Sequence, residues 1–309
     1  MCLAGASWSF AGAARHLAEF CGLRTCDQTI RAVCHGQAKA VADWLHADKA
    51  AGAAFARAAG EVEFQTDGTM VNTTAAGWRE MRLGVFAKRE PGRPATAAEW
   101  ATRRLPEPAA RLLFGGVETA ARFGPRIRRW AGRLGVRDPT AVTVLADGAE
   151  WIWNQAAVQL PGAAGVLDIF HALEHVAACS HALFGEATDA ARDWGGRARQ
   201  ALLTGGAAAV AALLAEARRP LRSAAKRRAV DGLANYFAER AAHLGYAGRL
   251  AAGQSIGSGL VEGACKQVIG RRMKQTGARW AIRRANRMAT LCCALHGDAW
   301  DAYWKHALP

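Results

Sequence analysis

The spacing of apolar positions predicts helices over the first 60 residues. Leu17 and Phe20 recur at helical spacing, Gly22 ends that helix, and Asp27 can cap a second one over 28–45. The segment fits a helix-turn-helix with a two-residue turn, and a plain helical hairpin fits it equally well. Residues 1–60 are therefore expected to form a helical region, either a helix-turn-helix or a plain helical hairpin.

The pattern changes at residue 61 to the alternation typical of strands. EVEFQTDGTMVNT and WREMRLGVFAKRE predict a β-hairpin, and a proline-rich stretch with a short helix around Trp100 follows it. Residues 118–134 predict an amphipathic helix. The short apolar runs in AVTVLADG and GVLDIF predict two strands buried on both faces, with a helix over 150–160 between them. The sequence thus predicts an α/β fold around a mixed sheet.

Only helices are expected between residue 171 and about residue 246, where glycines punctuate the pattern. The turn at Gly257-Ser258-Gly259 opens a further helix over 260–274, and two more helices close the chain. We therefore divide the chain into a helical region (1–60), a first part of the sheet core (61–170), an all-helical insertion (171–253) and a C-terminal part of the core (254–309).

The amino-acid composition predicts a globular, soluble chain. Hydrophobic residues make up 51% of the 309 residues, and the longest uninterrupted apolar run, 207–215, is too short to span a bilayer. No signal peptide is expected. The eight cysteines have no paired-ligand spacing, which favours buried free thiols in a reducing cytoplasm over a zinc site.

The distribution of charge indicates which class of partner the protein binds. The formal net charge is +14, and residues 217–290 alone contain 16 lysines and arginines against three acids. A basic segment of that density is typical of nucleic-acid binding, although a solvent-exposed helical surface would have the same composition. The expected DNA contacts are Lys266, Arg271, Arg272, Lys274, Arg227 and Arg228.

Three carboxylates are candidates for chemistry. Asp67 and Asp147 each precede a glycine at or near the expected end of a strand, and Glu262 lies in the first turn of its helix. Oxygen ligands of this kind suit Mg²⁺, and shared carboxylates can hold the two cations that phosphodiester chemistry uses. Taken singly, each residue is more often structural, as part of a turn or of a helix start, than functional.

Long ordered motifs connect these residues to a known family. VTVLADGAEWIWN, GVLDIFHALEH and SIGSGLVEGACKQVIGRRMKQTGARW resemble the bacterial insertion-sequence transposases of the ISKra type, as do FQTDGTMVNT, WREMRLGVF, CLAGASWSF and DAYW. The resemblance covers about residues 2–304. The family's members carry further DNA-binding sequence before the segment that begins here, so we expect this copy to be short at its N-terminus.

The resemblance implies a DDE transposase with an RNase H-like mixed sheet flanked by helices, and an all-helical insertion before the catalytic glutamate helix. Asp67, Asp147 and Glu262 would be the catalytic and metal-binding triad. Asp168 and His171 would support the site or position DNA. The implied cofactor is Mg²⁺ or Mn²⁺, as two ions. The implied partners are double-stranded DNA, as element ends and target, and further copies of the chain on DNA. The location would be the cytoplasm, at the nucleoid.

Two alternatives remain open at this point. A transposase-derived DNA-binding protein would keep the fold without catalysis. A zinc protease of the H-x-x-E-H type would use His171, Glu174 and His175, with Glu239 or Glu262 as a third ligand.

Overall fold

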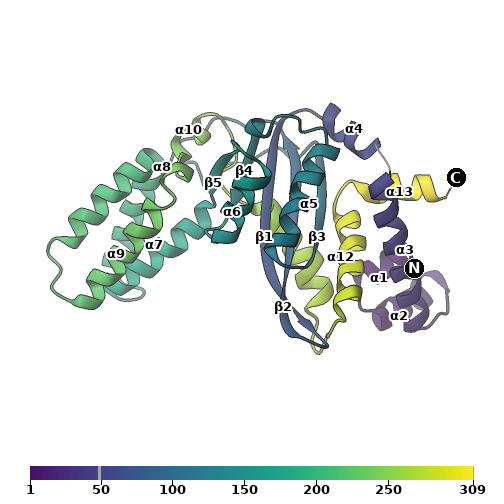
Figure 1. Cartoon of the computed structure of the whole chain (residues 1–309). Coiled ribbons are helices and arrows are strands. Elements are labelled where there is room, and N and C mark those ends of the chain that lie inside the picture. Colours follow the sequence, from purple (N-terminus) through teal and green to yellow (C-terminus); the bar gives the residue numbers. More distant parts are fainter. Residues whose placement is uncertain (48–49, 309) are drawn as a thin grey trace.

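A five-stranded mixed sheet lies at the centre of the computed structural model, which describes residues 1–47 and 50–308 (Figure 1). Helices flank the sheet, so the predicted α/β class is confirmed. The strand order is β3-β2-β1-β4-β5. The strands are β1 (Glu61–Thr73), β2 (Gly77–Arg89), β3 (Ala110–Val117), β4 (Val142–Ala146) and β5 (Ala164–Leu167).

The β1–β2 hairpin is the longest part of the sheet. The two strands pair antiparallel along their whole length and are joined at 74–76, as the alternating pattern predicts. β4 and β5 extend the other side of β1 as parallel strands. Asp67 lies in the middle of β1, opposite Leu83 of β2, so its predicted place near the end of a strand is wrong.

The third strand was not predicted. β3 pairs antiparallel with β2 and is buried over most of its length. Its two adjacent glycines disfavour a strand locally, but a side chain at Gly115 would approach the carbonyl oxygen of Arg82 to 2.6 Å, so the close approach of β2 requires glycine there. The short helix expected around Trp100 is also wrong, because residues 97–102 form only turns.

The N-terminal region is helical, as predicted. Gly22 ends its second helix in the left-handed conformation, with φ 64°, where glycine is favoured. The connection to the next helix covers residues 22–26, which is longer than the predicted two-residue turn. These helices are α1 (Cys2–Ser7), α2 (Phe10–Cys21), α3 (Asp27–Ala47) and α4 (Ala50–Arg57).

Helices cover both faces of the sheet. One face carries α5 and α6, which bury Phe123 and Ile152. The other face carries the C-terminal elements from Gly259 to Ala307, which we call the return segment. The helices α1 and α3 pack against this segment. The first pair is α5 (Ala120–Arg133) and α6 (Glu150–Gln159), with a 3₁₀ turn at Pro139–Ala141 before β4; the return elements are α11 (Gly259–Ala264), the π-helical segment η3 (Cys265–Arg271), α12 (Ile282–His296) and α13 (Ala299–Ala307).

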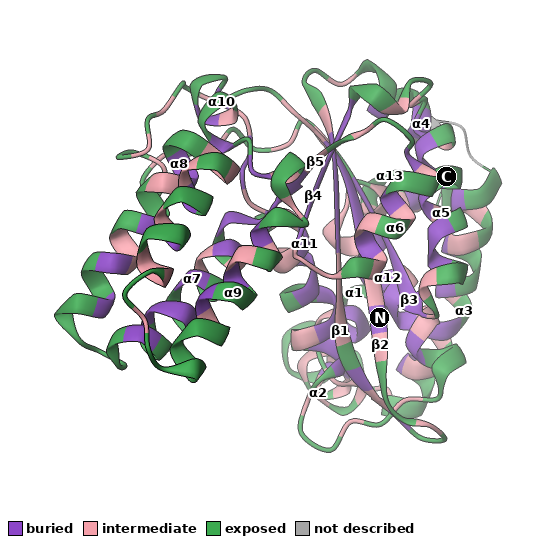
Figure 2. Cartoon of the chain, turned by 60° about the vertical axis from the view of Figure 1, so that its left-hand side comes forward, coloured by how far each residue is buried: buried purple, intermediate pink, exposed green. Residues whose placement is uncertain are grey.

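Residues 171–253, all within the described part of the chain, form only helices and turns, so the predicted helical insertion is confirmed. This helical block has its own core, which includes Trp194 and Phe237 and continues onto Val166 of β5 (Figure 2). Gly206, with φ 55°, breaks the longest helix. The block consists of α7 (Ile169–Phe184), α8 (Asp189–Arg218), α9 (Ala224–Ala238), a 3₁₀ turn at Ala241–His243 and α10 (Tyr246–Ala251).

Among the described residues, only α8 is long and apolar enough by composition to cross a membrane. It packs against α7 and α9 and contributes Leu202 and Leu214 to the core of the block. Cys21 and Cys26 are exposed, so the expectation of buried thiols holds only for the other six cysteines.

Arg272 fastens the return segment to the N-terminal helices. Its side chain is buried, and its Nε donates to the carbonyl oxygen of Gly5 at 2.7 Å. Its guanidinium lies over the rings of Phe10 and Trp280, at 4.6 and 5.2 Å from their centroids. The prediction that Arg272 contacts DNA is therefore wrong, because these groups enclose the guanidinium.

We expect Arg272→Ala to lower the free energy of unfolding by about 2–3 kcal/mol, because it removes a charge-assisted hydrogen bond and two cation–π contacts. Urea denaturation measures this loss. The neighbouring exposed Arg271→Ala is the control and should change stability by no more than about 0.5 kcal/mol. Equal effects from both substitutions would contradict a structural role for Arg272.

Candidate carboxylate site

The parallel register places three aspartates side by side. Gln65 of β1 pairs with Leu145 of β4, so Asp67 and Asp147, each two residues further on, are at the same level. Ala146 of β4 pairs with Leu167 of β5, which puts Asp147 level with Asp168. Neighbouring strands lie about 4.8 Å apart. The sheet thus gathers three carboxylates at the carboxyl ends of β4 and β5.

Asp67 is the most perturbed of these groups. Burial raises the pKa of its carboxyl, and the negative charge of Asp147 raises it further. Hydrogen bonds from the amide of Gly68, at 2.6 Å, and from the thiol of Cys265 oppose the shift without cancelling it. Burial of Asp67 and the charge of Asp147 beside it together favour a cation at this position.

The glycines after Asp67 and Asp147 have a different role from the predicted one. The space beside Gly68 is filled by the carboxylate end of Glu80, and the space beside Gly148 is filled by Tyr236. A Cβ atom at Gly148 would lie 2.5 Å from the phenol oxygen. These positions therefore need glycine for packing within the protein, and not for the approach of a ligand to the backbone.

Asp168 is fully buried, and both of its carboxylate oxygens accept hydrogen bonds. Oδ1 caps α7 by accepting from the amide of His171 at 2.9 Å. Oδ2 accepts from the amide of Ser258 and from its hydroxyl, the latter at 2.8 Å. Asp168 therefore joins the start of α7 to the loop that precedes α11.

The return segment follows β1 and brings Glu262 to the same face of the sheet. The hydroxyl of Ser255 donates to Glu63, and the amides of Leu260 and Val261 donate to Oε1 of Gln65 at 3.1 and 3.2 Å. Glu63, Gln65 and Asp67 alternate along β1 and so share one face. The contact of Cys265 with Asp67 places the next helical turn there as well.

Glu262 lies close to Asp168 and His171. One potential ligand atom from each of the three residues lies within 4.8 Å of the others. Burial lowers the pKa of His171, but the carboxylates of Asp168 and Asp147 more than offset this, so the net pKa is raised. Its Nδ1 lies 3.5 Å from Oδ1 of Asp168.

The H-x-x-E-H residues do not form a common site. His175 stacks on Tyr236 with ring centroids 3.8 Å apart, Glu174 is exposed, and Glu239 pairs with Arg240. Within the described part of the chain, the group of potential ligands around His171 contains neither His175 nor Glu239. The arrangement does not support a zinc-protease site.

The donor set fits a hard divalent cation. Asp67, Asp147 and Glu262 offer the oxygen ligands that Mg²⁺ and Mn²⁺ prefer. Within the described residues, however, the ligand atoms that lie within 4.8 Å of one another belong to Asp168, His171 and Glu262, and Asp67 and Asp147 are not part of that group. The burial of Asp67 and the charge of Asp147 beside it are features that a cation would relieve. Asp168 already accepts three hydrogen bonds, so it is better placed to hold Ser258 than to bind an ion.

The predicted DNA-contact residues occupy three different environments. Lys266, with its Nζ 3.8 Å from Glu262, Arg271 and Lys274 are exposed on the return segment; Lys274 also donates to Thr69 at 2.5 Å. Arg272 is buried. Arg227 and Arg228 lie where α8 turns into α9, at the end of the helical block away from the sheet (Figure 1), and Nε of Arg227 donates to the carbonyl oxygen of Leu221.

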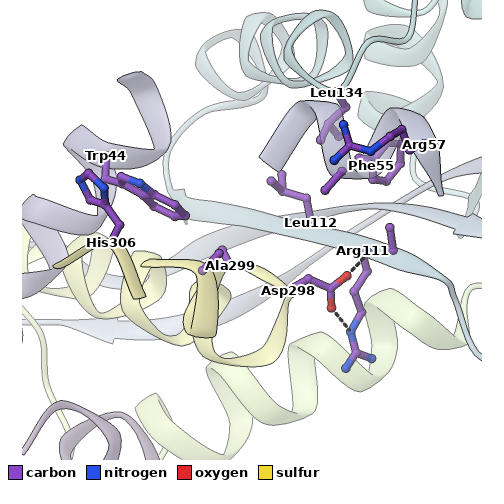
Figure 3. Close-up of a pocket in the computed structure, with 12 residues that line it drawn as sticks. Trp44, Phe55, Arg57, Arg111, Leu112, Leu134, Asp298, Ala299 and His306 are labelled. Carbon is purple, nitrogen blue, oxygen red and sulfur yellow. Dashed lines mark hydrogen bonds and ion pairs between the residues drawn. The ribbon is translucent and has the colours of Figure 1, made fainter. Parts of the chain in front are cut away.

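An apolar cavity of about 420 Å³ lies elsewhere, at the β3 edge of the sheet (Figure 3). Trp44, Phe55 and Leu112 line it. Asp298 accepts from the amide of Arg111 at 2.7 Å, so this acid is already engaged. The cavity is separated from the carboxylates of β1, β4 and β5 by the width of the hairpin.

No family model and no curated protein matches the chain. Interpretation of the site therefore depends on its residues and geometry. Sequence reasoning missed Gln65, Ser258 and Arg240, which hold the site's segments together. Only the Gly257-Ser258-Gly259 turn gave a local signal; the contacts of Gln65 and Arg240 are with residues distant in sequence.

Asp67 should destabilise the cation-free protein at neutral pH. A carboxyl whose pKa is raised on folding costs stability once it ionises, as the pH rises through the unfolded value toward the folded one. We expect Asp67→Asn to raise Tm at pH 7 without added metal, and the gain to shrink as the pH falls toward the ordinary carboxyl range. The exposed Asp193→Asn is the control. A lower Tm for Asp67→Asn at pH 7 would refute the argument.

Proposed function

We propose that the chain is the catalytic part of a DDE transposase, which cleaves DNA and transfers its 3′ ends in a reaction that depends on a divalent cation. The observation that carries this proposal is the presence of Asp67, Asp147 and Glu262 on one face of the sheet. The long motifs that resemble ISKra-type transposases contain these same three residues.

The architecture is compatible with the RNase H-like core that the resemblance implies. An antiparallel hairpin with a third strand is continued by two parallel strands, and helices lie on both faces. The helical block separates β5 from α11, between the second aspartate and the glutamate. This arrangement supports the proposed fold and explains why residues distant in sequence meet at one site.

Each residue then has a physical role. Asp67, Asp147 and Glu262 would hold the cations, and Asp168 would keep α7 and Ser258 in place. When bound, two such cations stabilise the charge that develops on a phosphodiester during in-line displacement. The exposed Lys266, one turn beyond Glu262, would donate to a phosphate of the substrate strand.

Double-stranded DNA, as element ends and target, is the proposed partner, with Mg²⁺ or Mn²⁺ as cofactor and two ions in the site. We also propose that several copies assemble on DNA and that the protein works at the nucleoid in the cytoplasm. A DNA-binding protein that kept the fold without catalysis is the alternative, and the cleavage experiment below separates the two.

Asp67→Asn, Asp147→Asn and Glu262→Gln should each reduce Mn²⁺-dependent cleavage of a labelled element end by at least ~10²-fold, because each removes a cation ligand. DNA binding should persist in an assay without metal. Asp193→Asn, an exposed acid of α8, is the matched control. A wild-type protein that binds the end but does not cleave it would favour the non-catalytic alternative.

Lys266→Gln, Arg271→Gln and Lys274→Gln should weaken binding to all DNA sequences. Each should also flatten the dependence of log affinity on log salt by about 0.9, the value for one lost phosphate contact. Arg129→Gln, exposed on the opposite face of the sheet, should leave the slope unchanged. An unchanged slope in all three variants would show that these residues form a solvated surface.

A further inference from the structure

The helical block holds the turn that presents Asp147. Both carbonyl groups of this turn accept hydrogen bonds from side chains. The carbonyl oxygen of Asp147 accepts from Nε1 of Trp153 at 3.1 Å, and that of Gly148 accepts from Nη2 of Arg240 at 2.8 Å. Trp153 belongs to α6, directly after the turn, whereas Arg240 follows α9 and is 92 residues away.

Tyr236, one helical turn before Arg240, completes this contact. Its ring stacks on the imidazole of His175, and the guanidinium of Arg240 lies 4.3 Å from the ring centroid. Nη1 of Arg240 donates to the carbonyl oxygen of Tyr236 at 3.0 Å. The phenol oxygen occupies the space beside Gly148, as described above, so the ring packs directly against the turn.

We propose that Tyr236 and Arg240 are positioning residues, through which the helical block holds Asp147 in the orientation that binds a divalent cation. The inference rests on the proposed function. Its physical reason is geometric. The hydrogen bond from Arg240 and the packing of Tyr236 fix the backbone at Gly148, directly after Asp147.

Linkage makes this coupling reciprocal. A cation that binds Asp147 in the held orientation also stabilises the docking of α9 against the turn. Loss of the docking contact should therefore weaken cation binding, even though neither Tyr236 nor Arg240 belongs to the ligand set.

The test measures Mn²⁺ affinity by calorimetry, without DNA, at a temperature well below unfolding. Arg240→Met keeps the length of the side chain and removes its donors. We expect it to weaken Mn²⁺ binding about tenfold, the lower end of the effect of losing a contact that orients a ligand. Arg240→Lys, which keeps one charged donor, should recover part of the loss. Arg228→Met, at the far end of the block, is the control.

Two further variants separate positioning from folding. Tyr236→Leu removes the aromatic ring and Gly148→Ala pushes the ring away, so each should weaken Mn²⁺ binding while Arg240 remains. Circular dichroism checks that each variant keeps its helices. If Arg240→Met unfolds the block, Arg240→Lys and Gly148→Ala decide the question.

The control for the proposed function is Asp147→Asn. If it loses Mn²⁺ binding while Arg240→Met, Arg240→Lys and Gly148→Ala, all folded, bind as the wild type does, the positioning inference is wrong and the proposed site stands. If Asp147→Asn binds Mn²⁺ unchanged, both the proposed site and the inference are overturned.

Discussion

The parallel register of β1, β4 and β5 is the constraint on which the candidate site depends, because it brings carboxylates from three strands to one level of the sheet. Parallel pairing of β1, β4 and β5 fixes Asp67, Asp147 and Asp168 at one level, where strand separation alone keeps the charges within a few ångströms. The fold treats them differently. Asp168 accepts three hydrogen bonds, whereas burial raises the pKa of Asp67 and the charge of His171 lowers it without cancelling the shift. Of these aspartates, Asp67 is therefore the one that a divalent cation would stabilise most.

Holding such a site together requires contacts between segments that are far apart in the chain. The return segment is fastened to β1 at Glu63 and Gln65, and to the start of α7 at Asp168. These bonds close a loop that contains the entire helical block. The entropic cost of closing a loop rises only slowly as the loop becomes longer. An insertion of this size is tolerable at this point of the fold because its two ends are fixed by the same sheet edge. The helical block also contacts the carboxylate site, because Arg240 donates to the carbonyl oxygen of Gly148.

Periodic, local signals in the sequence predicted much of this architecture. The hairpin, β4, the helical block and the Glu262 helix each carry a pattern that their own residues determine, and each is present. β3 lacked such a pattern, because its glycines are explained only by the backbone of β2. The site was predictable only in its residue types. Arg272 is buried although its neighbour Arg271 is exposed, and Tyr236 fills the space at Gly148. Both features depend on contacts between residues more than 80 positions apart, which the local spacing of residues does not predict.

The excess positive charge consists of two physically different populations. Arg240, Arg249 and Arg272 are largely enclosed and donate to the carbonyl oxygens of Gly148, Ser255 and Gly5. Burial lowers the pKa of Arg249 and Arg272, but guanidinium remains charged at neutral pH and offers several donors in one plane, which suits it to joining distant backbone segments. Lys266, Arg271 and Lys274, by contrast, present their charges to solvent beside the carboxylates. A net charge of +14 therefore overstates the number of phosphates that the protein can contact, since part of it holds the site's own backbone in place.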